Sequence, residues 1–204
     1  MTRNLFCYLN QYDDKAWWNC TLSSLSAGLL LAAVIFSTQA AWIKGKAWFA
    51  QYLIEDVWIT QQHTGERVAP WPWADTYPAA RLLLPGQNPL YVLAGVSGRN
   101  LAFGPTLQLF TAQPGEHGNI VVYGHNDTHF ASLEKLKPGQ IIRLENASGE
   151  TVFYRVSLSE VISEHDTEWV TENSDDVLTL VTCYPFSSAT FNGPERYVVV
   201  ADRV

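Results

Sequence analysis

Three residues with reactive side chains stand at the ends of apolar runs in the C-terminal half of this 204-residue chain. Cys183 follows the run at residues 178–182, and His125 follows the run at residues 120–124. Arg196 opens the last, valine-rich run. Runs of this kind are typical of buried strands, so a strand could hold each side chain at its end. Three strand ends could meet at one rim of a barrel, but sequence spacing alone does not show that they do.

A cysteine, a histidine and an arginine could together carry out nucleophilic acyl transfer. The thiolate is the nucleophilic form of cysteine, and a nearby cation favours it. Histidine can return a proton to a leaving amine, and a guanidinium can stabilise an oxyanion. Two of the three also have a simpler interpretation, Cys183 as a small buried apolar residue and Arg196 as a member of a surface ion pair. Cys7 and Cys20 precede a long apolar segment, so Cys183 has no disulfide partner in the folded region.

The region after Ala79 consists of short β-branched and aromatic runs, separated by turn signals such as Pro85-Gly86 and Ser148-Gly149. Residues 131–136 are expected to form one or two helical turns. Many short strands with few helices predict an all-β domain, either a sandwich or a closed barrel. The strands are predicted at residues 81–84, 90–93, 119–123, 140–144, 151–162, 177–182 and 196–201.

An uncharged segment precedes this region, because no charged residue lies between Lys15 and Lys44. Residues 22–43 are long enough to cross a bilayer, which takes about 20 residues of helix. Trp42 stands where interfacial aromatic residues are common. A cleaved signal peptide with its apolar centre at residues 27–36 is the alternative. The expected parts are an N-terminal segment (1–21), a transmembrane anchor or uncleaved signal (22–43), a juxtamembrane helix with a Pro/Trp-rich linker (44–78) and a C-terminal domain (79–204).

The charge of the chain argues against nucleic acid as a partner. The formal net charge is -7, and the sequence has no cluster of lysines and arginines. An acidic surface repels phosphate backbones, so a nucleic-acid-binding protein would need such a cluster.

The motifs around the three reactive residues resemble those of the sortases, a family of cysteine transpeptidases. Residues 179–183 read Thr-Leu-Val-Thr-Cys and match the TLxTC signature of that family. Gly124-His125 after an apolar strand is similar to the catalytic histidine site, and Arg196 after Gly-Pro-Glu is similar to the arginine site. Several further runs resemble the Gram-negative sortase class of marine proteobacteria. One departure is Asn126, where this class commonly has a basic residue.

This resemblance implies a closed eight-stranded β-barrel with short helices, and a two-step reaction that needs no cofactor. Cys183 would attack a C-terminal sorting signal similar to LPxTG and form a thioester, with His125 as acid/base and Arg196 as cationic stabiliser. An amine acceptor on the cell surface would then take the target protein. Thr182 would line the oxyanion site together with backbone amides, as in relatives. Asp127 could orient His125, or it could cap the following turn.

The resemblance also implies a location in the cell. A single-pass anchor would hold the protein in the inner (cytoplasmic) membrane, with residues 1–21 in the cytoplasm. The catalytic domain, residues 79–204, would lie on the extracytoplasmic, periplasmic side.

Three alternatives remain open at the level of sequence. His125 and His129 together with Cys183 could supply ligands to zinc, although no HExxH glutamate is present, and we expect no metal. Water in place of the amine would make the protein a cysteine peptidase. A membrane-tethered β-barrel binding module without enzymatic activity is the third alternative.

Overall fold

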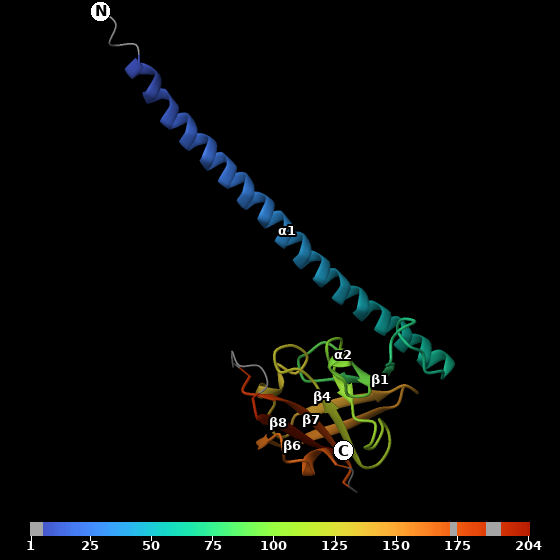
Figure 1. Cartoon of the computed structure of the whole chain (residues 1–204). Helices are drawn as coiled ribbons and strands as arrows, with labels where there is room; N and C mark the ends of the chain where they lie inside the picture. Colours follow the sequence, from blue (N-terminus) through green and yellow to red (C-terminus); the bar gives the residue numbers. More distant parts are fainter. Residues whose placement is uncertain (1–5, 172–174, 187–192) are drawn as a thin grey trace, which may run out of the picture. The chain divides into compact units, whose positions relative to one another are not determined.

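The computed structural model describes the backbone of residues 6–171, 175–186 and 193–204, and within these ranges the side chains from residue 25 onward. The chain forms two units, residues 1–48 and residues 49–204, which we describe separately. Helix α1 (Phe6–Thr64) begins in the first unit and ends in the second (Figure 1). The apolar segment and the helix expected after it are therefore parts of one continuous helix.

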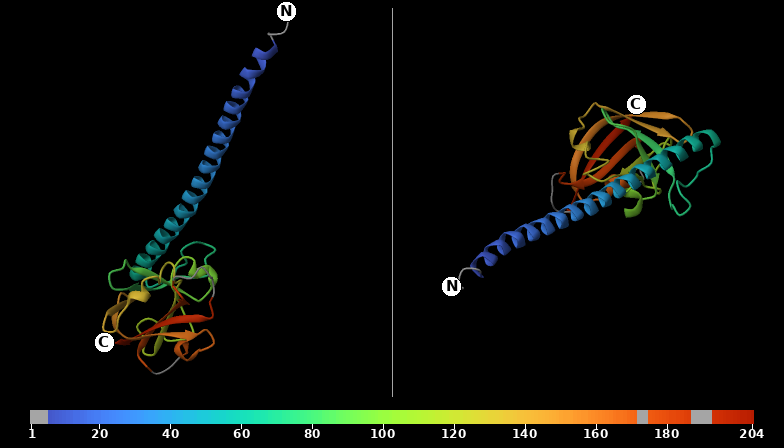
Figure 2. Two further views of the ribbon diagram at one scale, coloured as in Figure 1. Left: turned by 90° about the vertical axis from the view of Figure 1, so that its left-hand side faces the viewer. Right: turned by 90° about the horizontal axis from the view of Figure 1, so that it is seen from above.

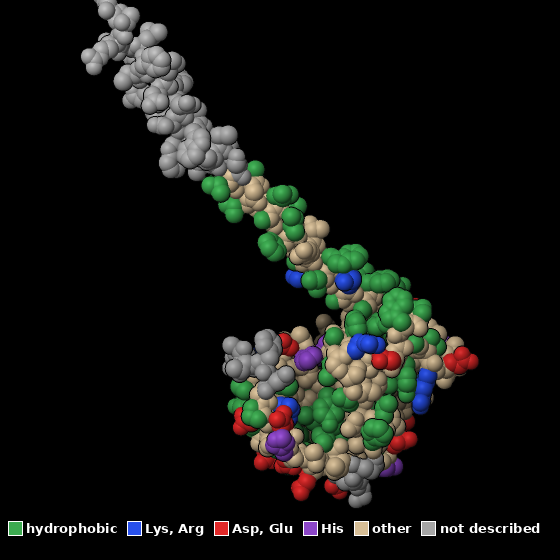
Figure 3. Space-filling model, viewed as in Figure 1, with side chains coloured by type: hydrophobic (Ala, Val, Ile, Leu, Met, Phe, Trp, Pro, Cys, Tyr) green, Lys and Arg blue, Asp and Glu red, His purple; other side chains and the backbone are tan. Residues whose placement is uncertain are grey.

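The N-terminal part of α1 leaves its apolar side chains exposed. Leu29 and Phe36 are 72% and 69% exposed, and Figure 3 shows apolar side chains along the described length of this part. Such a surface is unfavourable in water and typical of a helix that contacts lipid. The ammonium of Lys46 lies 5.4 Å from the centre of the Trp42 ring. By length and composition, α1 from Leu25 onward is the one described helix that could cross a membrane, although a signal sequence meets the same criteria.

Eight strands of the second unit form one closed barrel in the order β1-β2-β3-β4-β7-β8-β6-β5 (Figures 1 and 2). The β2–β3 and β4–β7 pairs are parallel, and the other pairs are antiparallel. The strands are β1 (Pro78–Leu83), β2 (Leu90–Ala94), β3 (Thr106–Leu107), β4 (Asn119–Tyr123), β5 (Ile141–Asn146), β6 (Thr151–Ser163), β7 (Val177–Tyr184) and β8 (Glu195–Arg203). The short helices are α2 (Gly98–Leu101) and the 3-10 helices η1 (Leu133–Lys135) and η2 (Glu168–Val170). This confirms the predicted all-β fold, which is a closed eight-stranded barrel with short helices after an apolar N-terminal helix.

Two details of the strands differ from the prediction. Strand β3 was not predicted, because two residues after a proline are too short to show any alternation of apolar and polar side chains. Strand β7 continues to Tyr184, where it still pairs with Glu195 of β8. Cys183 therefore lies within β7 and not after its end, because the neighbouring strand supplies hydrogen bonds that the sequence of β7 alone does not reveal.

Alternate residues of the strands point to opposite faces of the barrel wall and form two apolar clusters. The inward side chains form the barrel core, which includes Ile120 and Val122 of β4 and Leu178 and Leu180 of β7. The outward side chains form a second cluster on β4, β6, β7 and β8, which we call the outer cluster. Its buried members are Val121, Ile162, Val181, Val198 and Val200. Full burial of each such side chain contributes about 1.5–3 kcal/mol, so both faces stabilise the same strands.

The C-terminal part of α1 packs on the barrel as an element of the second unit. Ile54 and Trp58 are buried, and the ring centre of Trp58 lies 6.1 Å from that of Tyr91 in β2. The buried amide of Gln61 donates from Nε2 to the Pro78 carbonyl at 2.8 Å. These contacts fix the end of the helix to the first strand of the barrel.

Candidate active site

Strand pairing brings Cys183 and Arg196 side by side. Cys183 of β7 lies directly opposite Arg196 of the antiparallel strand β8. Residues in this relation have their Cβ atoms about 4.5–5.5 Å apart and their side chains on the same face. Val181 and Val198, each two residues away on the two strands, belong to the outer cluster. The alternation along a strand therefore puts both reactive side chains on the outer face of the barrel.

His125 reaches the same face from the other side of β7. Strand β4 runs parallel to β7, with Tyr123 opposite Val181, and both side chains belong to the outer cluster or pack on it. The ladder continues beyond β4, because Gly124 N donates to the Val181 carbonyl at 3.1 Å. Continued two residues beyond Tyr123, the same pairing and alternation predict that His125 comes beside Cys183 with its side chain on the outer face.

The exposure of the three side chains fits a site open to solvent. Cys183 has a free thiol and is half-buried, whereas His125 is exposed. The side chain of Arg196 is 26% exposed. The sulfur is therefore not enclosed in the core, and the body of the barrel does not separate it from the other two residues.

Two hydrogen bonds tie the backbone on either side of His125 to the strand that carries Cys183. The Thr182 hydroxyl donates to the carbonyl of Gly124 at 2.7 Å. The Asn126 amide donates from Nδ2 to the carbonyl of Pro185 at 3.1 Å. The contact of Asn126 was not expected, because the sequence shows only that it replaces a basic residue. The His125 turn is thus held to β7 both before and after the histidine.

Gly124 has to be a glycine because of its close contact with Phe130. A Cβ atom at position 124 would come within 2.6 Å of the Phe130 ring, whose side chain is fully buried. Phe130 N also donates to the His125 carbonyl at 2.9 Å. The buried aromatic ring therefore fixes the path of the backbone immediately before His125, and any larger residue would displace one of the two.

The strands and side chains described above correspond to a known family. Residues 86–204, more than half of the chain, match the Sortase domain family. The chain belongs to the sortase family. The match includes all three candidate catalytic residues of this sortase, and it begins after β1.

Individual relatives of this sortase are similar over part of their length. Sortase D of Bacillus subtilis is 37% identical over 92 residues, which are 45% of this chain and 46% of that protein. The chain thus spans about half the length of the curated relative that it matches. Among solved structures, sortase A from Corynebacterium diphtheriae superposes with a TM-score of 0.57 at 28% identity, covering 65% of this chain and 63% of that one. Sortase C-1 from Actinomyces oris gives 0.56 at 24% identity, covering 74% and 97%, and supports the fold alone.

Thr182 and Asp127 of this sortase have other surroundings than the sequence suggested. Thr182 is 2% exposed, and its hydroxyl is bonded to the carbonyl of Gly124. This contact holds the His125 turn. A role of Thr182 at an oxyanion site stays a prediction. Asp127 is exposed. Among the described residues no hydrogen bond joins Asp127 to His125 or to the backbone of the following turn, so neither predicted role has a contact to support it.

His129 lies close enough to His125 to interact with it electrostatically. Burial lowers the pKa of His129, the charge of His125 lowers it further, and the carboxylate of Asp127 opposes the shift. A histidine of this kind is neutral at pH 7. The described part of the chain contains no group of three His, Cys, Asp or Glu side chains arranged to hold a metal ion, so the zinc alternative gains no support.

The guanidinium of Arg196 is held by three acceptors. Its Nη1 donates to the carbonyls of Gly193 at 2.6 Å and Glu195 at 2.8 Å. Its Nη2 donates to Oε2 of Glu164 at 2.7 Å. Arg196 is thus both a member of an ion pair, as the simpler interpretation held, and a neighbour of Cys183. Sequence reasoning missed Glu164, since it lies just after β6 in a polar stretch with no motif of its own.

Residues 164–171, which follow β6, cover part of the outer cluster. Trp169 and Val170 pack against it. The buried amide of Asn119 donates to the carbonyls of Trp169 at 3.1 Å and Thr171 at 3.0 Å, and it accepts from the Thr179 hydroxyl at 2.7 Å. This buried polar group joins the segment to β4 and β7 on the face that carries Cys183.

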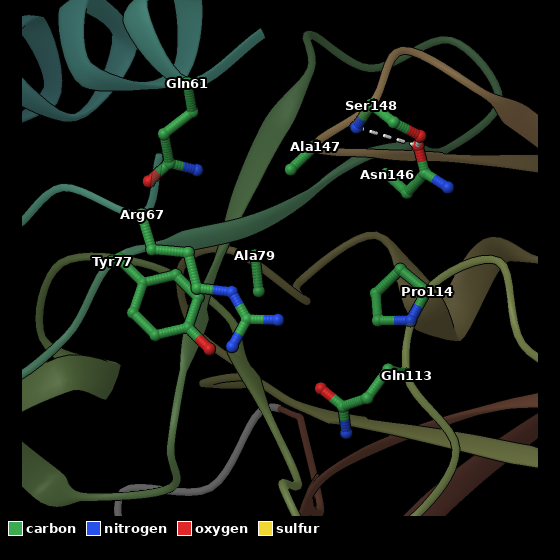
Figure 4. A pocket seen from close by; sticks show the side chains of 9 residues that line it. All are labelled: Gln61, Arg67, Tyr77, Ala79, Gln113, Pro114, Asn146, Ala147 and Ser148. Carbon is green, nitrogen blue, oxygen red and sulfur yellow. Dashed lines mark hydrogen bonds between the residues drawn. The ribbon is translucent and has the colours of Figure 1, made fainter. Parts of the chain in front are cut away.

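A separate pocket of about 200 Å³, shown in Figure 4, has none of the three candidate residues in its lining. The guanidinium of Arg67 lies 5.2 Å from the centre of the Tyr77 ring at its edge. Most polar side chains of this pocket are bonded to the protein itself, for example Ser148 to Asn146 and Gln113 to the Thr111 carbonyl. The pocket is therefore distinct from the candidate active site.

Proposed function

We propose that this protein is a membrane-anchored sortase that joins target proteins to an amine acceptor by way of a thioester on Cys183. The single observation that supports this most is the register of the strands. It sets Cys183 opposite Arg196, and the pairing of β4 with β7, continued two residues beyond Tyr123, would bring His125 alongside on the same face of the barrel. The membership of the chain in the sortase family supports the same reaction class.

In the first step, the Cys183 thiolate attacks a backbone carbonyl carbon in an LPxTG-like sorting signal. The carbonyl electron pair moves to oxygen, and the guanidinium of Arg196 stabilises the resulting oxyanion. The tetrahedral intermediate then collapses and the peptide C–N bond breaks. The protonated imidazole of His125 gives its proton to the departing amine, which leaves a thioester on the sulfur and a neutral histidine.

In the second step, the amine of the acceptor attacks the thioester carbonyl. His125 takes the proton of the attacking nitrogen, and the Cys183 thiolate leaves when the second tetrahedral intermediate collapses. The products are a new amide bond and the enzyme in its starting state. Water in place of the amine would give hydrolysis, so the acceptor decides between transfer and peptidase activity.

The location that we propose rests on α1. A helix with exposed apolar side chains from Leu25 onward would anchor the chain in the inner membrane as a single span. The catalytic domain would then lie on the extracytoplasmic side, where surface proteins carry their sorting signals. The motif similarities support our proposal that the protein is of the Gram-negative sortase class, with Asn126 as its departure from that class.

Product analysis tests this function. The full-length chain in detergent is incubated with LPxTG-like peptides, with and without hydroxylamine as the amine. We expect cleavage with transfer to the amine to exceed hydrolysis, and no product from Cys183→Ala. Hydrolysis that is indifferent to the amine would favour the peptidase, and product formation by Cys183→Ala would exclude Cys183 as the nucleophile. A chain that neither cleaves nor transfers any peptide would favour the binding module.

A further inference from the structure

The contacts of Arg196 with the described residues use three of its N–H donors. The group carries five N–H donors in a rigid plane. Two carbonyls, those of Gly193 and Glu195, take both donors of Nη1, and the Glu164 carboxylate takes one of Nη2. Among the described contacts, two donors are left to bond a substrate. The three acceptors fix where those two donors lie.

Glu164 is itself held in place by the backbone around it. It follows the last residue of β6, Ser163, which pairs with Glu195 of β8. Glu164 N donates to the Pro194 carbonyl at 2.8 Å. Its carboxylate therefore starts from a fixed backbone position close to Arg196 and loses little freedom on forming the contact.

The ion pair adds little to the stability of the fold. The side chains of Glu164 and Arg196 are 37% and 26% exposed, and pairs that solvent can reach contribute only about 0–1 kcal/mol. A contact of this kind has more effect on the direction of the guanidinium than on the free energy of unfolding. In acyl transfer that direction matters, because donors act on the oxyanion only when they already point at it.

We propose that Glu164 is a positioning residue that holds the Arg196 guanidinium for its role beside Cys183. This inference rests on the proposed function, which assigns oxyanion stabilisation to Arg196. Glu164 opens the same segment that packs Trp169 and Val170 on the outer cluster.

The opposite role for Glu164 would be competition with the substrate. A carboxylate that occupied the substrate-binding donors would have to leave before the oxyanion formed, and its removal would raise the rate. The described contacts favour positioning, since Glu164 takes one donor and leaves two. The two roles predict opposite signs for the same substitution.

Steady-state kinetics of the full-length chain with an LPxTG-like peptide and hydroxylamine separate these outcomes. We expect Glu164→Ala to lower kcat about tenfold with less than about a twofold change in KM, since misplacement of a stabilising group acts on the transition state. Glu164→Gln keeps an acceptor oxygen and should retain kcat within about threefold. Glu168→Ala, in the same segment but outside the contacts of Arg196, is the matched control and should leave both constants unchanged.

A double-mutant cycle with Arg196→Ala distinguishes positioning from a general structural effect. If Glu164 acts through Arg196, adding Glu164→Ala to Arg196→Ala causes no further loss. An additive loss, or a Glu164→Ala variant with unchanged or raised kcat, would overturn the inference. Normal turnover in both Glu164 variants would overturn this inference and leave the proposed function intact. Wild-type protein without turnover would overturn the proposed function and this inference together.

Discussion

The two faces of β4, β7 and β8 are made by alternate residues of the same strands, yet they differ in how they end. On the inner face, the apolar side chains pack against one another in the barrel core, and Leu178 and Leu180 are fully buried. On the outer face, the apolar pattern of Val181 and Val198 stops short and gives way to Cys183 and Arg196. The comparison indicates that both faces stabilise these strands and that the end of the outer face alone is free for chemistry.

The largest expected effect is on the outer face and concerns activity alone. Cys183→Ala should abolish peptide cleavage and transfer, a loss of at least about 1,000-fold, because the variant has no nucleophile. The melting temperature should stay within a few degrees of wild type, because the half-buried thiol makes a small contribution to packing. We would measure product formation and thermal unfolding on the same samples. Residual turnover near the wild-type rate would contradict the assignment of the chemistry to the end of the outer face.

The matched change on the inner face should have the opposite profile. Leu180→Ala leaves a cavity in the barrel core and should lower the free energy of unfolding by about 2–5 kcal/mol. Chemical denaturation of the variant and the wild type measures this loss. Activity per folded molecule at low temperature should remain close to wild type, because Leu180 does not reach the outer face. A stable Leu180→Ala protein without activity would contradict this separation.

Thr182 connects the two faces, and its substitution should affect both properties moderately. Thr182→Val keeps the shape of the side chain but leaves the Gly124 carbonyl without its 2.7 Å partner. We expect a loss of about 1–3 kcal/mol in the free energy of unfolding. The rate should also fall, because the turn before His125 loses one of its ties to β7. Thr182→Ser, which retains the hydroxyl, is the control and should recover most of the rate.

The smallest effect is expected at the opposite end of β4 and β7. Hydrogen bonds from His117 and from Gly118 N lower the pKa of Asp176. A carboxyl whose pKa is lowered on folding stabilises the protein above its unfolded value, near 3.8, and this contribution is lost as the pH falls through the lowered value. Asp176→Asn should therefore melt slightly below the wild type at pH 7. The difference should shrink below pH 4, and a difference that does not depend on pH would contradict this origin.

The sequence predicts the all-β class and seven of the strands because each has its own apolar pattern. It also identifies Cys183, His125 and Arg196 as candidate catalytic residues, since each stands beside such a run and within a recognisable motif. Strand β3 and the contacts of Asn126 and Glu164 were not predictable in this way. Each depends on a partner distant in the sequence, such as Pro185 for Asn126, and leaves no local signal.

The central claim, that a sulfur and an imidazole act together on the outer face, can be tested without knowledge of the sorting signal. The rate at which iodoacetamide alkylates Cys183 is measured against pH, with mass spectrometry of the Cys183 peptide to exclude Cys7 and Cys20. The wild type and His125→Ala should differ both in rate and in the shape of the pH profile, because an imidazole beside the sulfur can accept the thiol proton as the sulfur reacts. Superimposable profiles would contradict the account.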